Sequence, residues 1–445
     1  MPSTTKTPKG TDHIVDQYHD TIAYLESLTR LQQARSKYQR SPQAALQRFN
    51  YFLQLLNNPH KNPHIHYIHV AGTSGKGTTV AMTQAILSAA GHKTGMLISP
   101  HVTTVLERIS IDGLFISAKE FSTIINSFRS AIDHLHTKTN YGVPSYFEII
   151  TAVAFVYFKK NNCSHAVIET GVGGLYDSTN VIPAPHTCVI TRIDYDHMEL
   201  LGKRIDQIAR HKAGIIKKNA IVVISSNQRP AAKKVIVQKS ASVDATLVTV
   251  QPAAGDQMPD APGAYQLENA SLAIAAAQSC GVESQSIMKA GLCNAFQPCR
   301  FETMQKKPRV IIDGAHNVSK LQALASALEK LTYQKLYLII GLTKIRNPRK
   351  LFAPLIPRAH VIIATQYHNN RFKKPHSPVA LMHALKTHTV RKQVYAYTHS
   401  HDALAHALAA AGPRDLIVIT GSLYLAGEMR NYWQPIAHII HQRHW

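Results

Sequence analysis

The chain has 445 residues, enough for two or three domains with substantial cores, and its 45% apolar content is that of an ordinary globular protein. No apolar run reaches the roughly 18 residues that span a bilayer, so we expect no membrane partner. The formal net charge of +23 favours a polyanionic partner, either nucleic acid or an anionic small substrate, although scattered basic residues also fit a solvated basic surface.

The start of the chain and the cysteines bear on where the protein works. Met1–Thr11 is polar and contains no apolar segment of the kind found in secretory signals. The five cysteines show no close metal-type pairing, so we interpret them as buried free thiols in a reducing compartment. We therefore expect a cytoplasmic protein.

The first predicted elements are helical. Apolar residues recur at helical spacing over Asp16–Asn57, and the polar, proline-containing segment Asn57–His60 then breaks the pattern. The apolar residues from Ile65 to Val70 predict a buried strand directly after this break.

A glycine-rich loop, Gly72–Thr78, joins this strand to a further predicted helix. The backbone N–H groups of such a loop, together with the helix N-terminus, can bind a phosphate. The Lys76 ammonium would then reach the β- and γ-phosphates, and the Thr78 hydroxyl could hold Mg²⁺. The strict P-loop pattern is not met, because Val70 stands where it has glycine and Gly77 separates the lysine from the hydroxyl. Phosphate binding is still favoured over a purely structural turn.

Polar side chains stand at the ends of several later strands, which is where α/β sheets bind ligands. Ser99, Glu169 and His197 each lie at or shortly after such an end. The strands are predicted over Thr94–Ile98, His165–Glu169 and Cys188–Thr191. Taken alone, Ser99 is more simply a loop residue and His197 a structural histidine.

The segment up to the domain boundary contributes three further candidates. Lys212 lies in Ile208–Ile215, and a helix starting at Tyr265 carries Gln266 and Asn269 at its N-terminus, where capping is the simpler role. Strands are predicted over Val222–Ser225 and Thr246–Val250, a helix over Pro230–Lys239, and a loop over Gln251–Gly263. The boundary itself is predicted at Gln297–Arg300.

A second α/β unit follows this boundary. A buried strand over Val310–Ile312 ends at Asp313 and leads through His316 to a helix predicted over Val318–Leu331. Ser422 follows the last strand, where a helix N-cap is its simpler role. Further strands are predicted over Leu336–Ile340, Val361–Ala364, Val394–Tyr397 and Leu416–Thr420. This alternation predicts a small, mostly parallel sheet.

Several motifs between Asn58 and Met429 resemble, in unchanged order, those of folylpolyglutamate synthases and dihydrofolate synthases, the folate branch of the Mur-ligase superfamily. The matching segments are Gly72–Thr79, Ser99–Ile109, Glu169–Asn180, Asp196–Ile215, Asp313–Asn317 and Gly421–Glu428. The resemblance implies an α/β protein with a P-loop NTPase-like Mur-ligase central domain over residues 1–298 and a smaller Rossmann-like, glutamate-ligase domain over residues 299–445. In that family, the stretch here spanning Val105–Gly113 forms a mobile loop over the active site.

The resemblance also implies the roles of the site residues. The catalytic residues would be Lys76, Lys212, Arg300, Asp313 and His316. ATP would bind to Gly72, Thr73, Ser74, Gly75, Lys76, Gly77, Thr78, Gln266, Asn269, Arg300 and Asp313. Magnesium, as two ions, would be held by Thr78, Ser99, Glu169, His197 and Lys212, with Lys212 carbamylated. His316 and Ser422 would bind substrate, with Ser422 near the incoming L-glutamate.

In this family a carboxylate of a folate or of dihydropteroate attacks the γ-phosphoryl group of ATP, and L-glutamate then displaces phosphate from the acyl phosphate. We expect a monomer with no nucleic-acid partner. A Mur-type ligase for a different carboxylate, and a catalytically weakened basic nucleotide-binding protein, remain alternatives. The chain departs from the family pattern at His211, where an acid is usual, and at Lys344–Arg346, where an acidic segment is usual.

Overall fold

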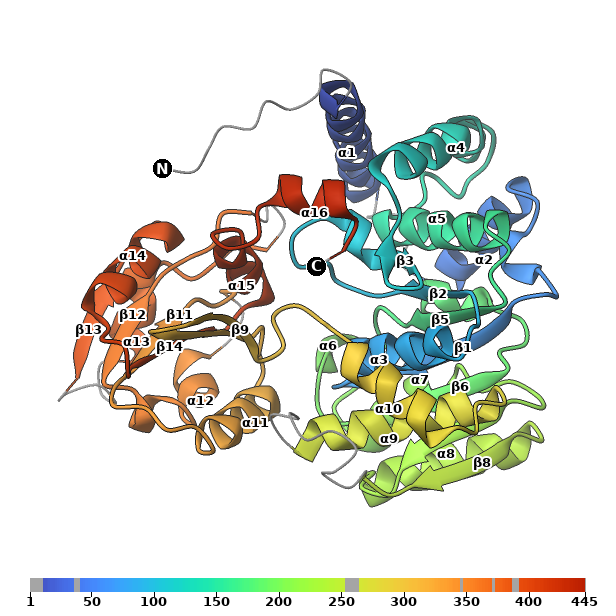
Figure 1. The fold of residues 1–445 in the computed structure, drawn as a ribbon. Coiled ribbons are helices and arrows are strands. Elements are labelled where there is room, and N and C mark those ends of the chain that lie inside the picture. The colour runs from blue at the N-terminus through green and yellow to red at the C-terminus, as the bar shows by residue number, and fades with distance from the viewer. Residues whose placement is uncertain are drawn as a thin grey trace.

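The computed structural model describes residues 11–35, 41–252, 264–344, 347–369, 373–385 and 392–444. Within them, two α/β units lie side by side, each built around its own β-sheet (Figure 1). The polar start and nearly all of the loop expected over Gln251–Gly263 fall outside the described residues, as do Ile345 and Arg346. No described helix combines the length and apolar character needed to cross a membrane.

The first unit is built on an eight-stranded sheet in the order β4-β3-β2-β5-β1-β6-β7-β8. Its strands are β1 (His66–Ala71), β2 (Thr94–Leu97), β3 (Ile109–Ile111), β4 (Leu114–Phe115), β5 (His165–Glu169), β6 (Thr187–Ile190), β7 (Ile221–Ser225) and β8 (Thr246–Val250). All run in the same direction except β3, which pairs antiparallel with both β2 and the edge strand β4. The side chains of β1, β5 and β6 are almost entirely buried, as in a sheet covered on both faces.

Alternation along the strands sends neighbouring side chains into different cores. Tyr67 packs with helices α1, α2, α4 and α5 on one face, whereas Ile68 packs with α3, α9 and α10 on the other. Helices α7 and α8 cover the far end of the first face. The helices are α1 (Thr11–Arg35), α2 (Pro42–Leu55), α3 (Lys76–Ala89), α4 (Ala118–Lys138), α5 (Tyr146–Lys160), α6 (Met198–Leu201), α7 (Ile205–Ala213), α8 (Pro230–Ser242), α9 (Ala264–Ser279) and α10 (Gln285–Asn294).

The second unit has a six-stranded sheet in the order β13-β12-β11-β14-β10-β9, with only β9 antiparallel to its neighbour. Its strands are β9 (Glu302–Lys306), β10 (Arg309–Ile312), β11 (Leu336–Ile340), β12 (Val361–Ala364), β13 (Gln393–Ala396) and β14 (Leu416–Thr420). Its helices are α11 (Val318–Leu328), α12 (Pro348–Phe352), α13 (Pro378–Leu385), α14 (Ser400–Ala410), α15 (Leu423–Arg430) and α16 (Ile436–Gln442). Helices α11 to α13 cover one face, and α14 and α15 cover the other. The two-unit α/β fold expected from the sequence is confirmed.

One stretch differs from the expected mobile loop. Strands β3 and β4 form a hairpin at the sheet edge, and Ile109 and Ile111 of β3 are buried against the first core. Asp112 and Gly113 form its turn with positive φ angles of 50° and 81°, the backbone that a two-residue hairpin connection favours. Burial of the alternating isoleucines explains why the chain pairs with the sheet here.

The end of the chain returns to the first unit. Ile439 and Ile440 of α16 belong to the first unit's core, although α16 follows the second unit in sequence (Figure 1). The Arg443 guanidinium donates to the Phe115 carbonyl oxygen (2.8 Å), and the Phe115 N–H donates to the Arg443 carbonyl oxygen (2.6 Å). A side chain at Gly427 of α15 would collide with the Val102 carbonyl oxygen, so the two units also meet closely there.

His69 on β1 makes the first unit sensitive to acid. The imidazole is fully buried, its Nε2 lies 2.8 Å from the Thr179 hydroxyl, and burial lowers its pKa from 6.5 to about 3. As the pH falls below 6.5, the unfolded chain takes up a proton that the folded chain does not, so acidification favours unfolding. Between pH 7.5 and pH 5 the free energy of unfolding should therefore fall by about 2 kcal/mol less in His69→Gln than in the unmodified protein. Denaturant unfolding at the two pH values measures this difference.

His64→Gln is the matched control, because His64 is exposed. An acid-induced loss of stability that is the same in His69→Gln as in the unmodified protein would contradict the assignment.

Candidate active site

The glycine-rich loop between β1 and α3 is fixed by the segment that follows β6. The Thr73 N–H donates to the Arg192 carbonyl oxygen (3.0 Å), and the Thr191 hydroxyl donates to the Ser74 carbonyl oxygen (2.7 Å). A side chain at Gly72 would collide with the Thr191 hydroxyl, so the close approach requires glycine. The loop therefore has a defined shape at the carboxyl edge of the sheet.

The same loop meets the start of α9. Gly75 has a φ of 86°, and a side chain there would collide with the Asn269 carboxamide. Asn269 in turn donates to the Gln266 side-chain oxygen (3.2 Å). The structure thus brings these two predicted nucleotide-binding residues to the phosphate loop.

A buried carboxylate faces the loop lysine. Glu169 ends β5, next to β1, and its Oε1 lies 3.8 Å from the Lys76 ammonium. Its Oε2 accepts the backbone N–H of Ser99 (2.8 Å). Burial raises the pKa of Glu169, while Lys76 and the Ser99 N–H oppose that shift. A second cation beside this desolvated carboxylate would further stabilise its charged form.

Lys212 lies inside the same region. Its side chain is buried, and its Nζ donates to the Gly72 carbonyl oxygen (2.7 Å). Desolvation, helped by the nearby Lys76 charge, lowers the pKa of Lys212 to about 7. A substantial fraction of this lysine is therefore a neutral amine near physiological pH. The neighbouring His211 ring packs against Tyr176 instead, with ring centroids 5.9 Å apart.

His197 is not brought to the Glu169 carboxylate. Its side chain is 43% exposed at the start of α6, and its Nδ1 lies 3.7 Å from Glu199 Oε1. Within the described residues, no group of three or more histidine, cysteine, aspartate or glutamate side chains is arranged to hold a metal ion. The metal-binding role of His197 stays a prediction.

The donors around Gly77 nevertheless fit magnesium chemistry. A side chain at Gly77 would collide with the Gln297 carboxamide, with the Glu169 carboxylate just beyond it. The Thr78 hydroxyl, one residue on, adds another oxygen, and Mg²⁺ prefers such oxygen ligands while keeping several waters.

The second unit contributes Arg300 and Asp313. The Asp313 carboxylate follows β10 and accepts the N–H groups of Phe301 and Ala315, each at 2.8 Å. Burial raises the pKa of Asp313, and the Arg300 charge opposes this shift most strongly. Cys299 and Phe301 have φ angles of 56° and 55°, so Arg300 lies between two residues with left-handed backbone.

A buried ion pair holds this linker, and the sequence motifs did not reveal it. Glu302 Oε2 accepts the Cys299 N–H (2.8 Å), while the Arg430 guanidinium donates to both Glu302 carboxylate oxygens at 3.0 Å. Arg430 and Glu302 are both buried. Because α15 carries Arg430, this helix fixes the backbone beside Arg300.

The two predicted substrate-binding residues follow neighbouring strands of the second sheet. His316 follows β10 and Ser422 follows β14, which pair in parallel. The Ser422 hydroxyl accepts the Tyr424 N–H (3.2 Å) and caps α15, which is its simpler role. His316 Nδ1 lies 2.8 Å from the Gly314 carbonyl oxygen, and its Nε2 lies 3.4 Å from Lys320 Nζ. Lys320 was missed: it lies in the first turn of α11, whereas His316 precedes the N-cap Asn317, so no helical spacing signals their contact.

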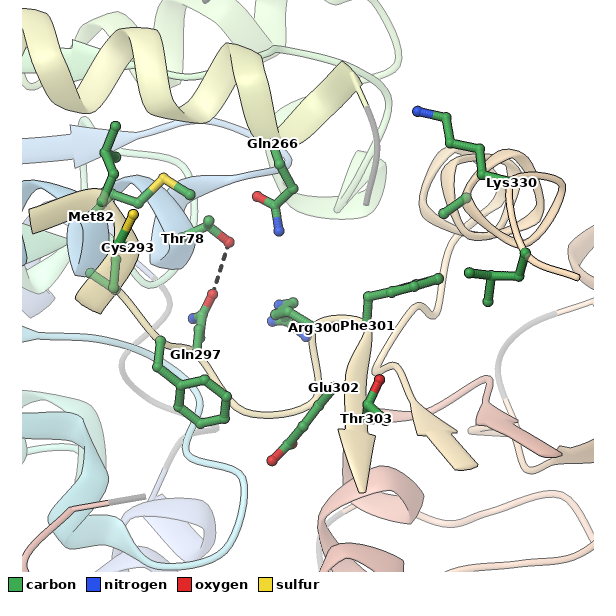
Figure 2. Close-up of a pocket in the computed structure, with 16 residues that line it drawn as sticks. Thr78, Met82, Gln266, Cys293, Gln297, Arg300, Phe301, Glu302, Thr303 and Lys330 are labelled. Carbon is green, nitrogen blue, oxygen red and sulfur yellow. Dashed lines mark hydrogen bonds between the residues drawn. The ribbon is translucent and has the colours of Figure 1, made fainter. Parts of the chain in front are cut away.

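Two cavities open where the units meet. The smaller, of about 260 Å³, has Ser74 and Gly75 on one side and Arg300, Asp313 and Lys320 on the other. The larger, of about 670 Å³, lies beside the linker. Figure 2 shows Gln266, Thr78 and Gln297 facing Arg300 across this larger cavity. Thr78 and Arg300 line both cavities, so the predicted nucleotide-binding residues of the two units converge.

The comparisons with known proteins agree with this arrangement. The family model for the Mur ligase middle domain matches residues 70–258, and the model for the Mur ligase, glutamate ligase domain matches residues 299–423. These matches define a Mur-type ligase.

Relatives that match over most of their length show to which branch of the Mur-type ligases the chain belongs. The chain is 31% identical to a dihydrofolate synthase/folylpolyglutamate synthase of Bacillus subtilis, over 86% of this chain and 94% of the relative. It is 31% identical to a folylpolyglutamate synthase of Lacticaseibacillus casei, over 93% of this chain and 98% of the relative. A structure of Mycobacterium tuberculosis folylpolyglutamate synthase complexed with ADP superposes with a TM-score of 0.82 at 28% identity, covering 93% of this chain and 99% of that one. The chain belongs to the folylpolyglutamate synthase/dihydrofolate synthase family.

Gln297 supplies a test of the loop. The Thr78 hydroxyl donates to the Gln297 side-chain oxygen (2.8 Å; Figure 2), so a magnesium ion bound at Thr78 would replace this contact. Losing one such hydrogen bond costs the nucleotide-free protein about 1 kcal/mol. We predict that Gln297→Ala binds MgATP about five-fold more tightly in titration calorimetry.

The affinity for ADP without metal is the control and should stay the same, because that complex does not recruit the Thr78 hydroxyl to a cation. Weaker MgATP binding in Gln297→Ala would contradict the idea that magnesium replaces the Thr78–Gln297 hydrogen bond.

Proposed function

We propose that this protein is an ATP-dependent ligase that joins L-glutamate to a carboxylate of a folate-type acceptor and releases ADP and phosphate. The observation that supports this most directly is the smaller cavity, where the phosphate-loop residues Ser74 and Gly75 face Arg300 and Asp313. Neither unit alone surrounds a triphosphate with these groups. The named activities of the full-length relatives agree with the proposal.

The residues of the cleft suit phosphoryl transfer. Such a reaction asks the protein mainly to align the groups and to neutralise developing charge. Lys76 comes from the first unit and Arg300 from the second, so closing the cleft places cations on two sides of the γ-phosphate. The Asp313 carboxylate, held by two backbone N–H groups, is positioned to accept hydrogen bonds from the nucleotide.

Two bond exchanges complete the proposed reaction. A carboxylate oxygen of the acceptor attacks the γ-phosphorus, the bond to the β,γ-bridging oxygen breaks, and ADP leaves. The deprotonated amine of L-glutamate then attacks the carbonyl carbon of the acyl phosphate, and phosphate leaves with the former carboxylate oxygen. Closure of the two units excludes the water that would hydrolyse the acyl phosphate.

Magnesium and a modified lysine belong to the proposal. Thr78, Ser99, Glu169 and His197 are the proposed magnesium ligands, and bound magnesium would neutralise phosphate charge. The neutral amine of Lys212 can add to carbon dioxide, with loss of a proton, to give a carbamate. The low pKa of Lys212 and the surrounding positive charge both support that modification.

The proposal also covers the acceptor, the glutamate site and the place where the protein works. The net charge of +23 supports a folate that already carries γ-linked glutamates, because each added residue brings another negative charge. Dihydropteroate remains a second acceptor. We propose that L-glutamate binds near His316 and Ser422, that the domains meet at 298/299, and that the protein works as a cytoplasmic monomer.

The direct test is L-glutamate-dependent release of phosphate from MgATP, with dihydropteroate and tetrahydrofolate as separate acceptors. We predict turnover with at least one of them. Turnover with dihydropteroate identifies dihydrofolate synthesis, and turnover only with tetrahydrofolate identifies polyglutamylation.

Lys76→Met should lower kcat by at least about a hundred-fold, because it removes the ammonium that stabilises negative charge on the phosphoryl group during transfer. ATP binding without stimulation by either acceptor would exclude the folate assignment and favour another carboxylate substrate.

A further inference from the structure

Lys320 is a charged residue of the cleft to which none of the motifs assigns a role. It lies in the first turn of α11, four residues after His316, and its side chain is only partly exposed. It lines the smaller cavity opposite Ser74 and Gly75 of the phosphate loop. The second unit therefore presents an ammonium group to the loop from across the cleft.

His316 orients this ammonium. His316 Nδ1–H donates a hydrogen bond to the Gly314 carbonyl oxygen (2.8 Å), so in the neutral imidazole Nε2 is an acceptor. Lys320 Nζ lies 3.4 Å from that Nε2. An ammonium has three N–H donors, and the imidazole uses one of them. This long, weak contact positions the amine and does not neutralise its charge.

The charges around Lys320 favour an anion. Arg300 and Lys76 approach it as like charges, while Asp196, Asp313 and Glu169 are carboxylates that interact with it. Burial and the two cations together lower the pKa of Lys320 to about 7. Since Asp313 already accepts two backbone N–H groups, its charge is partly satisfied elsewhere. A phosphate entering the cavity would relieve the repulsion among these three cations.

We propose that Lys320 binds the terminal phosphate of the nucleotide and thereby lets the second unit distinguish ATP from ADP. This inference rests on the nucleotide site proposed above. Phosphate oxygens are strong acceptors for lysine, which interacts with them as a point charge. Because Lys320 lies on α11 of the second unit, its contact with the γ-phosphate would hold that unit close to the phosphate loop.

The test compares the affinities of a non-hydrolysable ATP analogue and of ADP, both with Mg²⁺, by titration calorimetry. Lys320→Met keeps the length of the side chain and removes the charge. We expect it to weaken binding of the analogue about ten-fold or more, in line with a charge-assisted hydrogen bond, and to change ADP binding less than about three-fold. Lys320→Arg, which keeps the charge, should restore most of the preference for the analogue.

Lys335→Met is the matched control, because Lys335 is exposed just before β11 and lines neither of the two cavities. It should bind both nucleotides like the unmodified protein. Thermal unfolding of Lys320→Met and of the more polar Lys320→Gln separates an effect on folding from an effect on binding.

A second readout follows proton uptake. Binding of an anion raises the pKa of a nearby ammonium, so the unmodified protein should take up more protons with the ATP analogue than Lys320→Met does near pH 7.5. Calorimetry in buffers of different ionisation enthalpy measures this difference.

Several outcomes would overturn the inference: equal losses of affinity for both nucleotides, no loss at all, or a raised KM for L-glutamate with unchanged nucleotide binding. Failure of the unmodified protein to bind any nucleotide would instead contradict the proposed function itself, and the role of Lys320 with it.

Discussion

The structure depends on a concentration of charge between two α/β units. Lys76 and Lys212 come from the first unit, and Arg300 and Lys320 from the second. The carboxylates that act on them are those of Glu169, Asp177, Asp196 and Asp313, of which all but Asp196 are buried. Burial lowers the pKa of both Lys212 and Lys320 to about 7, so the cleft holds these charges at an electrostatic cost. In the proposed function, the negative charge of a nucleoside triphosphate offsets that cost.

The remaining contacts of the cleft serve this arrangement. Glu302 and Arg430 form a buried pair that holds the backbone beside Arg300. At the far side, α16 packs Ile439 and Ile440 into the first core, so the second unit is attached at both the linker and the chain end. Any movement that closes the cleft is therefore restricted to a path that these two attachments permit.

The sequence predicted the parts of the fold and site that depend on local patterns. Apolar runs placed β5, β11, β12 and β14 at their observed bounds, because buried parallel strands are almost wholly apolar. The edge strand β8 was also placed at its bounds, although none of its residues is buried. The polar residues after strands also pointed to the cleft. The Thr78–Gln297 contact joins residues 219 positions apart in the chain and could not be predicted, and neither could the orientation of the Lys320 side chain. The metal-binding role of His197 stays a prediction, and in this structure its half-exposed imidazole lies near Glu199.

The central claim is that this cleft activates a carboxylate by phosphoryl transfer. Its most direct test uses an acceptor whose reacting carboxylate carries ¹⁸O on both oxygens, with MgATP and L-glutamate, and mass spectrometry of the released phosphate. The account predicts one ¹⁸O atom in each phosphate and one in the new amide, because a carboxylate oxygen leaves with the phosphoryl group. Phosphate without ¹⁸O, formed together with the amide product, would contradict an acyl-phosphate intermediate and the role assigned to the cleft.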